Sequence, residues 1–377
     1  MSFLSTLGVQ RARFDHAARW VLNRVARPSI VLVGEYHGAN LGDHLLGMAI
    51  SSRLRGLGHN PVLLTLHNLH REKVFRGVPI LMGGGNIMDA DSLVRMREYW
   101  NLSGQPPIAG VGLDFVAPGI FNSFEDFISK FGCVFLRSSV QAELARRALS
   151  TESGEIVGSA PDMAWLEEER LRGLAARTSK SSQKVGINVL PLFLRFTRNG
   201  DPVCAISAQD QFHAQASKEI EAYRDLVLST VAAYQSRGYE VIHVPFDVGD
   251  DALARRWLRP IGVQCAPYTT DIPTVMRRMS ACEFFVPTRF HALICAMAAG
   301  IPAKPIPYAL KNADLLRHFG FTHWAEQTPE VFCEDLRQIR ELLLGDEHVV
   351  LSKGVADAVC SDAGAAVQRA VHTLFER

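Results

Sequence analysis

The stretch CEFFVPTRFHALICAMAAG (residues 282–300) is expected to form an apolar strand that runs directly into a helix. Thr288 is expected to cap this helix and Gly300 to end it. The helix is expected to bury one apolar stripe, made of Phe290, Leu293, Ile294 and Met297. Arg289 and His291 flank this stripe at the carboxyl end of the strand, where open α/β sheets bind their ligands. The stretch therefore predicts an anion site with a titratable partner.

Short apolar runs alternate with helical segments on both sides of this unit. In the first half of the chain they are SIVLVGEY (29–36), PVLLTL (61–66), VPILMGGG (78–85), PPIAGVGL (106–113) and GCVFLRSS (132–139). The pattern restarts with KVGINVLPL (184–192) and YEVIHVPF (239–246), on either side of a long helix expected over residues 217–237. Apolar runs separated by helices are typical of parallel sheets that are covered on both faces. The sequence therefore predicts an α/β protein with two Rossmann-like, doubly wound domains that face each other across a cleft.

The length of 377 residues exceeds what one hydrophobic core usually supports. The composition turns polar in EEERLRGLAARTSKSSQ (167–183), which predicts an exposed helix and a linker. Arginines and apolar residues are interleaved at the start of the chain, which favours a helix packed on the domain with a solvated basic face; the alternative is a helix lying on a membrane surface. The predicted parts are a helical extension (1–28), an N-terminal domain (29–180), a C-terminal domain (181–355) and a C-terminal helix (356–377).

Composition excludes several classes of protein. Hydrophobic residues make up 47% of the chain and charged residues 21%, and 40 Lys+Arg balance 39 Asp+Glu. These values exclude a disordered chain and a general nucleic-acid binder. The 7 cysteines form no CxxC pair and lie mostly in apolar runs, which indicates reduced thiols. No leader-like segment and no run of about 20 apolar residues occurs. We therefore expect a cytoplasmic protein, with the inner face of the membrane as an alternative location.

Two glycine-containing segments of the first half are candidate ligand loops. In VLVGEYHGANLGDHLL (31–46), Gly42 allows close approach of a sugar or an anion, and Asn40 lies beside it. Asp43 is expected either to cap the next helix or to accept a hydrogen bond from a substrate hydroxyl. The second segment, Gly83-Gly84-Gly85-Asn86, costs conformational entropy, so a ligand role is favoured over a plain connection. Neither segment is GxGxxG, and no acidic residue follows the second strand, so an NAD site is not expected.

Three basic side chains are candidates for binding anions or moving protons. Arg137 follows the strand in GCVFLRSS and suits a phosphate or carboxylate, or else forms an interdomain ion pair at the surface. Lys311 opens a helix one βα unit beyond Arg289, where a cation opposes the helix dipole, so a bound anion is expected unless the side chain is simply solvated. His291 is either a core histidine or a neutral base near pH 7. His67 and His70 lack a carboxylate or cysteine at ligand spacing, so no metal site is expected.

Taken together, these motifs resemble those of the polysaccharide pyruvyl transferases. The arginine-histidine segment RFHALICAMAAGIPAKPIPYALK (289–311) resembles the family's R-[FL]-H-[AG] signature and the G-[IV]-P…Y…K that follows it. Four further segments resemble family motifs in the family's order: GEYHGANLGDHLL (34–46), GGGN (83–86), VFLRSSVQAEL (134–144) and APDMAWL (160–166). The likeness runs from Ile30 to Phe321 and implies a two-domain, GT-B-like fold.

The resemblance implies an activity and a role for each candidate residue. A pyruvyl group would pass from phosphoenolpyruvate to two hydroxyls of a sugar, with release of phosphate. The roles implied are donor binding by Arg137, Arg289 and Lys311, acid/base catalysis by His291, and acceptor binding or loop formation by Asn40, Gly42, Asp43, Gly84, Gly85 and Asn86. No redox cofactor, metal or nucleic acid is expected. The expected partners are phosphoenolpyruvate and a sugar acceptor that is free or lipid-linked, with the membrane or a polysaccharide assembly complex as a further partner.

Two alternatives remain open from the sequence. The first is a GT-B-type glycosyltransferase that uses a nucleotide sugar; such an enzyme usually has an acidic residue for the ribose after a strand of the second domain, and no obvious candidate lies beside His291. The second is a catalytically silent binding partner within a polysaccharide assembly complex.

Overall fold

The protein, described by a computed structural model, divides into two compact units. The structure describes residues 27–36, 40–115, 119–179, 181, 183–197, 201–328 and 336–375, apart from the side chain of Asn86. The described residues of Ala12–Glu168 and Gly354–Arg377 form the N-terminal unit, and those of Glu169–Lys353 form the C-terminal unit. The division falls inside the polar helix that was expected to precede the linker. The expected helical extension over residues 1–28 lies almost wholly outside the described residues.

The N-terminal unit is built on a parallel sheet of six strands in the order β2-β1-β3-β4-β5-β6. The strands are β1 (Ile30–Gly34), β2 (Pro61–Thr65), β3 (Ile80–Met88), β4 (Ile108–Phe115), β5 (Phe131–Leu136) and β6 (Val157–Ser159). Strands β1 and β4 are buried along their whole length, which is why their sequences are continuous apolar runs and not alternating ones. The strand order reverses between β1 and β3, the place where such sheets open to ligands.

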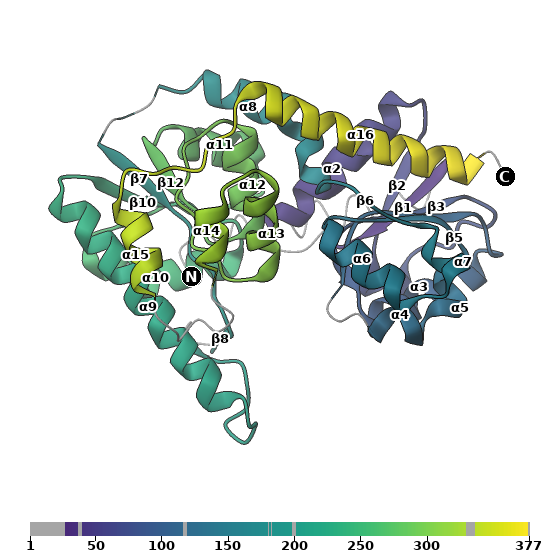
Figure 1. Ribbon diagram of the computed structural model, residues 1–377, viewed down its shortest axis with the longest axis horizontal. Helices are drawn as coiled ribbons and strands as arrows, with labels where there is room; N and C mark the ends of the chain where they lie inside the picture. Colours follow the sequence, from purple (N-terminus) through teal and green to yellow (C-terminus); the bar gives the residue numbers. More distant parts are fainter. Residues whose placement is uncertain are drawn as a thin grey trace. The chain divides into compact units, whose positions relative to one another are not determined.

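Helices cover both faces of this sheet, with α2 and α16 on one face and α3 to α6 on the other (Figure 1). Their bounds are α2 (Leu41–Gly56), η1 (Leu66–Arg71), α3 (Ala90–Leu102), α4 (Gly119–Ser123), α5 (Glu125–Ile128), α6 (Ser139–Ala148), α7 (Thr151–Gly154), η2 (Met163–Glu167) and α16 (Lys353–Phe375). The last helix packs on this unit, since the rings of Phe375 and His59 stack 4.6 Å apart. The Arg369 guanidinium also lies 4.8 Å from the ring centroid of Phe135. Helix α16 therefore completes the unit that begins the chain.

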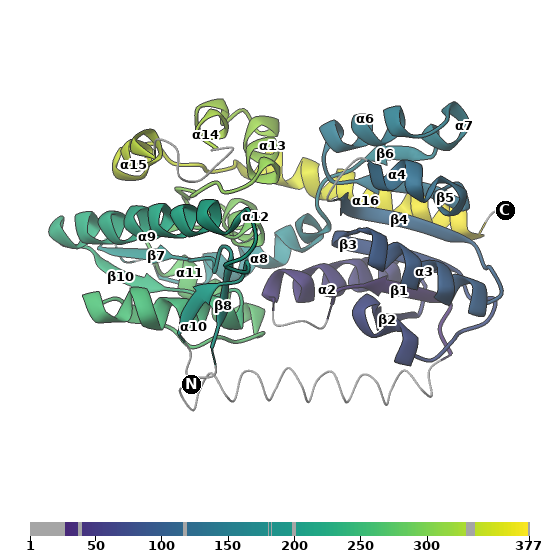
Figure 2. The same ribbon diagram turned by 90° about the horizontal axis from the view of Figure 1, so that it is seen from below.

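The C-terminal unit contains a parallel sheet of four strands in the order β11-β10-β7-β12. Its strands are β7 (Lys184–Ile187), β10 (Glu240–His243), β11 (Gln264–Cys265) and β12 (Phe284–Val286), and a separate antiparallel hairpin is formed by β8 (Leu194–Phe196) and β9 (Pro202–Cys204). Its helices are α8 (Glu168–Ala176), α9 (His213–Ser236), α10 (Val248–Trp257), η3 (Arg259–Ile261), α11 (Ile272–Ser280), α12 (Phe290–Ala298), α13 (Leu310–His318), α14 (Thr322–Glu326) and α15 (Arg337–Leu344). Helix α9 runs beside β10 (Figure 2). The expectation of two Rossmann-like domains is thus confirmed.

The strand and helix expected within residues 282–300 are β12 and α12. All 9 residues of α12 are buried, so the expected single apolar stripe is wrong: the helix lies inside the unit and has no solvated face. The expected cap is also wrong, because Arg289 occupies the N-cap position and the Thr288 hydroxyl instead donates to the backbone oxygen of Asn188 at 3.0 Å. Gly300 follows the C-cap residue with a φ of 66°, which confirms it as the end of the helix.

Candidate functional site

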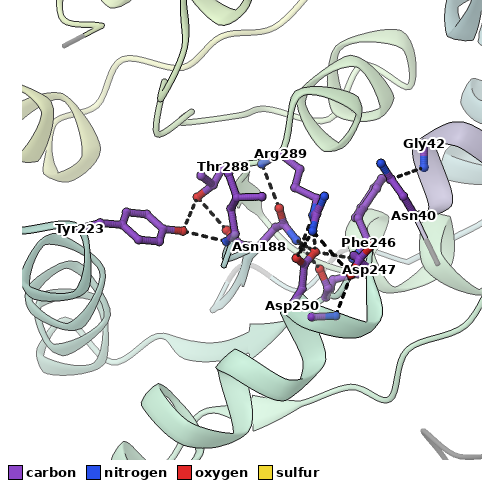
Figure 3. A network of polar contacts seen from close by, with 12 residues as sticks. Asn40, Gly42, Asn188, Tyr223, Phe246, Asp247, Asp250, Thr288 and Arg289 are labelled. Carbon is purple, nitrogen blue, oxygen red and sulfur yellow. Dashed lines mark hydrogen bonds and ion pairs between the residues drawn. The ribbon is translucent and has the colours of Figure 1, made fainter. Parts of the chain in front are cut away.

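Three neighbouring strands of the C-terminal unit end in polar residues that meet at one edge of the sheet. Asn188 follows β7, Asp247 and Asp250 lie where α10 begins after β10, and Arg289 follows β12. The order β10-β7-β12 places these strands side by side and parallel, so their carboxyl ends share an edge. Figure 3 shows the four side chains pointing toward one another.

The centre of this network is an ion pair between Arg289 and Asp250. Nε of Arg289 donates to both carboxylate oxygens of Asp250 at 2.8 Å, and Nη2 lies 2.7 Å from Oδ1. The Asp250 side chain is 0% exposed and the Arg289 side chain 15%. Burial acts to lower the pKa of Arg289, but the Asp250 carboxylate outweighs it and raises that pKa above its usual value. The guanidinium is therefore charged, and it is oriented by a buried carboxylate.

Only part of the Arg289 guanidinium remains available to a ligand. Nη2 lies 3.7 Å from Oδ1 of Asp247 in addition to its contact with Asp250. Among the described residues, Nη1 makes no hydrogen bond. An incoming anion can therefore meet the guanidinium at its Nη1 end, on the side away from Asp250, where Nη1 and the second N–H of Nη2 point.

Asn188 joins the two members of the ion pair. Its buried side-chain amide donates from Nδ2 to Asp250 Oδ2 at 3.0 Å and to the Val244 carbonyl at 3.2 Å. Its Oδ1 accepts from the backbone N–H of Arg289 at 3.0 Å. Asn188, Asp247 and Asp250 were not among the site residues predicted from the sequence. The sequence does contain a pattern that could have indicated them, because all three are polar residues that follow the apolar runs of β7 and β10.

A second buried contact holds the corner between β12 and α12. The Tyr223 hydroxyl of α9 lies 3.0 Å from Thr288 Oγ1, and it accepts from the backbone N–H of Leu190 at 2.9 Å. Burial raises the pKa of Tyr223 well above its usual value, so the hydroxyl stays protonated and donates to Thr288. The residue that precedes Arg289 is therefore fixed by both α9 and the end of β7.

The structure brings His291 and Lys311 together around the ring of Phe290. His291 lies in the first turn of α12, is 9% exposed, and has its ring 5.6 Å from that of Phe290 in an edge-on arrangement. Lys311, near the start of α13, has its Nζ 5.5 Å from the ring centroids of both Phe290 and Tyr308. The ring of Phe290 thus lies beside both an ammonium and an imidazole.

Arg137 occupies a different setting from the one expected. Its side chain is 4% exposed, Nη1 lies 3.1 Å from Asp162 Oδ2, and Nε donates to Asp114 Oδ2 at 3.1 Å. Nη2 also contacts Asp114, whose other oxygen accepts from Gln141. Two buried carboxylates therefore surround the guanidinium within the N-terminal unit. This corrects both interpretations from the sequence, since Arg137 is neither open to a donor anion nor at the surface.

The first glycine-containing segment is organised by a helix cap. Oδ1 of Asn40 accepts from the backbone N–H of Gly42 at 2.9 Å, so Asn40 is the N-cap of α2. The alternative that Asp43 caps the helix is therefore wrong, and Asp43 lies half-buried in the first turn. Gly42 is buried in that turn.

The second glycine-containing segment is part of β3 and not a loop after it. Gly84 and Gly85 have φ values of 73° and 91°, and the pairing with β4 shifts register just after them. A Cβ on Gly84 would lie 3.0 Å from Cβ of Leu46, whereas one on Gly85 would meet only Ile87, at 4.0 Å. Close packing against α2 thus accounts for glycine at residue 84. For Asn86 the side chain lies outside the described residues.

A histidine-carboxylate pair at the edge of the N-terminal sheet was also missed. Glu35 follows β1 and its Oε1 lies 2.7 Å from Nδ1 of His67, which follows β2 and has a side chain that is 71% exposed. The same oxygen accepts from the backbone N–H of His67 at 3.0 Å. Glu35 and His67 are 32 residues apart and come together because β1 and β2 are adjacent parallel strands, so the spacing of residues near His67 could not reveal this carboxylate. Over the described part of the chain, no group of three or more His, Cys, Asp or Glu is arranged to hold a metal ion.

Comparison with known families decides the affiliation of the chain. A model of the family described as polysaccharide pyruvyl transferase matches residues 40–309. The chain belongs to this family. The matched range includes Arg289 and His291 and ends just before Lys311, so the family model itself says nothing about Lys311. No curated protein matches the chain.

Among solved structures, the chain is similar to UDP-GlcNAc 2-epimerase from Neisseria meningitidis, with 11% identity, a TM-score of 0.45, and coverage of 92% of this chain and 99% of that one. It is also similar to an uncharacterized protein from Klebsiella pneumoniae, with 11% identity, a TM-score of 0.44, and coverage of 86% and 97%. In the residues that the structure describes, no helix is both long and apolar enough to span a bilayer.

Proposed function

We propose that the protein transfers the pyruvyl group of phosphoenolpyruvate to two hydroxyls of a sugar in a polysaccharide or its precursor, forming a cyclic ketal and releasing phosphate. The observations that carry this proposal lie at the start of α12: Arg289 there is held by Asp250 through Nε and Nη2, and the imidazole of His291 and Nζ of Lys311 both lie beside the ring of Phe290. Membership of the polysaccharide pyruvyl transferase family supports it.

The charges of these residues suit a donor with two anionic groups. Asp250 offsets the charge of Arg289, so one arginine does not balance a phosphate and a carboxylate. Lys311 supplies a second cation, and the two rings beside its Nζ limit where the ammonium lies. The N-terminus of α12 adds the positive end of its dipole. These groups together hold the donor and stabilise the phosphate as it leaves.

The chemistry requires a proton to be moved near this anion site. The methylene carbon of phosphoenolpyruvate gains a proton and becomes a methyl group, and C2 becomes electron-deficient. One sugar hydroxyl forms a bond to C2 and loses its proton, the bond from C2 to the phosphate oxygen breaks, and phosphate departs. The second hydroxyl then adds to C2 and loses its proton. We assign the proton transfer at carbon to His291, because an imidazole can both donate and accept a proton. The scheme uses no redox cofactor and no metal.

The test is phosphate release from phosphoenolpyruvate in the presence of sugars. The protein is incubated with the donor and with either nucleotide sugars or lipid-linked sugars, and phosphate and a product heavier by one pyruvyl ketal are measured. In deuterated water the new methyl group should carry one deuterium. His291→Asn should lower turnover at least about a hundredfold, whereas His323→Asn, at an exposed histidine of α14, should not. Release of UDP from a nucleotide sugar without phosphate release would contradict the proposal in favour of glycosyl transfer.

A further inference from the structure

We propose that Asp250 is a positioning residue: it fixes the guanidinium of Arg289 so that the Nη1 end alone meets the donor, and Asn188 holds both partners in place. The identity of the anion rests on the proposed function. The geometry of the pair does not.

The Asp250 carboxylate is surrounded by donors from several elements. Oδ1 contacts Nη2 and Nε of Arg289 at 2.7 and 2.8 Å. Oδ2 accepts from Asn188 Nδ2 at 3.0 Å and from the backbone N–H of Phe246 at 3.0 Å. Because β7, the start of α10 and the start of α12 all contribute, the carboxylate has one position. The guanidinium bound to it therefore has one orientation.

A second carboxylate, that of Asp247, also lies near Nη2 of Arg289. Asp247 accepts from the backbone N–H of Gly249 at 2.7 Å as the N-cap of α10, and the same oxygen lies 3.7 Å from Nη2 of Arg289. An anion that approached Nη2 would meet both carboxylates, whereas Nη1 makes no hydrogen bond among the residues that the structure describes. Asp250 thus sets the side from which the donor is bound.

A role confined to stability explains this arrangement less well. A buried ion pair is often no more stabilising than apolar residues of the same size, so stability alone gives little reason to place one here. The pair is also not sealed inside the core: the Arg289 side chain keeps 15% of its surface exposed, at the carboxyl edge of the sheet where α/β proteins bind ligands.

Removal of the Asp250 charge distinguishes two roles for this residue: orienting the guanidinium of Arg289, or only reducing the local positive charge. If Asp250 only reduced the local positive charge, Asp250→Asn would strengthen the binding of phosphoenolpyruvate. If it positions Arg289, the same variant should weaken binding about tenfold, as should Asp250→Glu, which keeps the charge and displaces the guanidinium. Titration calorimetry with phosphoenolpyruvate measures both. The matched control is Asp251→Asn, a buried neighbour whose partner is Arg255 and not Arg289. Binding in Asp250→Asn that is unchanged or tighter would overturn the proposal.

Chemical rescue supplies a readout that a structural role would not move. Arg289→Ala should lose donor binding, and added methylguanidinium should restore part of it, because Asp250 and Asn188 retain a site for a guanidinium ion. The double variant Arg289→Ala/Asp250→Asn should not be rescued. Rescue to the same extent in both variants would contradict a positioning role for Asp250.

A measurement without donor keeps this inference separate from the proposed function. The Nε–H of Arg289 should exchange slowly with water in the wild type, as seen by nitrogen-15 NMR, and rapidly in Asp250→Asn. If the wild type fails to bind phosphoenolpyruvate, the proposed donor is wrong while slow exchange still supports the pair. Rapid exchange in the wild type would overturn the positioning role whatever the donor.

Discussion

The backbone N–H of Arg289 donates to the side-chain oxygen of Asn188 at 3.0 Å, so the N-cap residue of α12 is held by the residue that follows β7. Asn188→Asp retains the shape but replaces the amide donor with a carboxylate that faces Asp250. We expect the free energy of unfolding to fall by about 2–4 kcal/mol, because two buried carboxylates then share one arginine. Urea unfolding measures the change, and Asn101→Asp, at an exposed residue of α3, is the control. Equal stability of the two variants would contradict the network.

Sequence patterns predicted β1 to β5, β7, β10 and β12 because buried parallel strands need continuous apolar runs, as in β1. The hairpin β8–β9 and the short strand β6 escaped prediction, since their three-residue sequences LRF, PVC and VGS contain no continuous apolar run of the kind that FFV forms in β12. Arg289, His291 and Lys311 were identified from their places at the starts of helices. The partners of Arg289 were not, because Asp250 and Asn188 are 39 and 101 residues away along the chain. Contacts of that kind depend on strand order, which local patterns do not encode.

Arg137 is expected to support folding and not the donor site. Arg137→Met leaves Asp114 and Asp162 buried without their cation, so we expect a loss of about 3–5 kcal/mol in the free energy of unfolding. Arg147→Met removes an arginine whose side chain is 72% exposed and should cost under about 1 kcal/mol. The affinity of the folded Arg137→Met protein for phosphoenolpyruvate should match that of the wild type. A selective loss of donor affinity with normal stability would return Arg137 to the donor site.

Alanine substitutions at Gly84 and Gly85 of β3 distinguish steric crowding from backbone strain. Both Gly84 and Gly85 have positive φ, so alanine strains the backbone at either residue by roughly 1 kcal/mol. Only at residue 84 does the new Cβ also press on Leu46, so Gly84→Ala should be the less stable variant by about 1–2 kcal/mol more. Thermal unfolding measures the stability of both variants, and because the backbone strain is nearly equal in the two, the difference reports the contact with Leu46. If Gly85→Ala were the less stable variant, the side chain of Leu46 would have to move aside at little cost.

Lys311 is expected to act on the donor through its charge. Lys311→Met keeps an unbranched side chain beside Phe290 and Tyr308 but removes the ammonium, so we expect affinity for phosphoenolpyruvate to fall about tenfold with little change in stability. The wild-type affinity should fall as salt is raised, and that of the variant should fall less steeply. The control is Lys353→Met, which removes one positive charge at an exposed residue. Titration calorimetry measures the affinity of each variant for phosphoenolpyruvate. Equal donor affinity in both variants would remove Lys311 from the site.

His243 should make the C-terminal unit sensitive to acid. The side chain is buried in β10, and neither ring nitrogen has a hydrogen-bond partner among the described residues. Burial, with a smaller effect from the charge of Arg255, lowers the pKa of His243 to about 3. In the unfolded chain a histidine titrates near 6.5, so between these values the unfolded state binds a proton that the folded state does not. Stability should therefore fall as the pH falls below about 6.5, by up to about 1.4 kcal/mol per pH unit from this residue.

Substitution of His243 by leucine isolates that contribution. His243→Leu fills a similar volume and removes a buried polar ring whose nitrogens have no hydrogen-bond partner in the described part of the chain, so its stability near pH 7 should equal or exceed that of the wild type. Between about pH 6.5 and pH 5 the variant should lose less stability than the wild type, because all other titrating groups are common to both proteins. Urea unfolding at several pH values gives the two slopes. If the slopes coincide, the His243 ring gains its proton in the folded state as readily as in the unfolded chain, and the burial of a neutral imidazole in β10 is refuted.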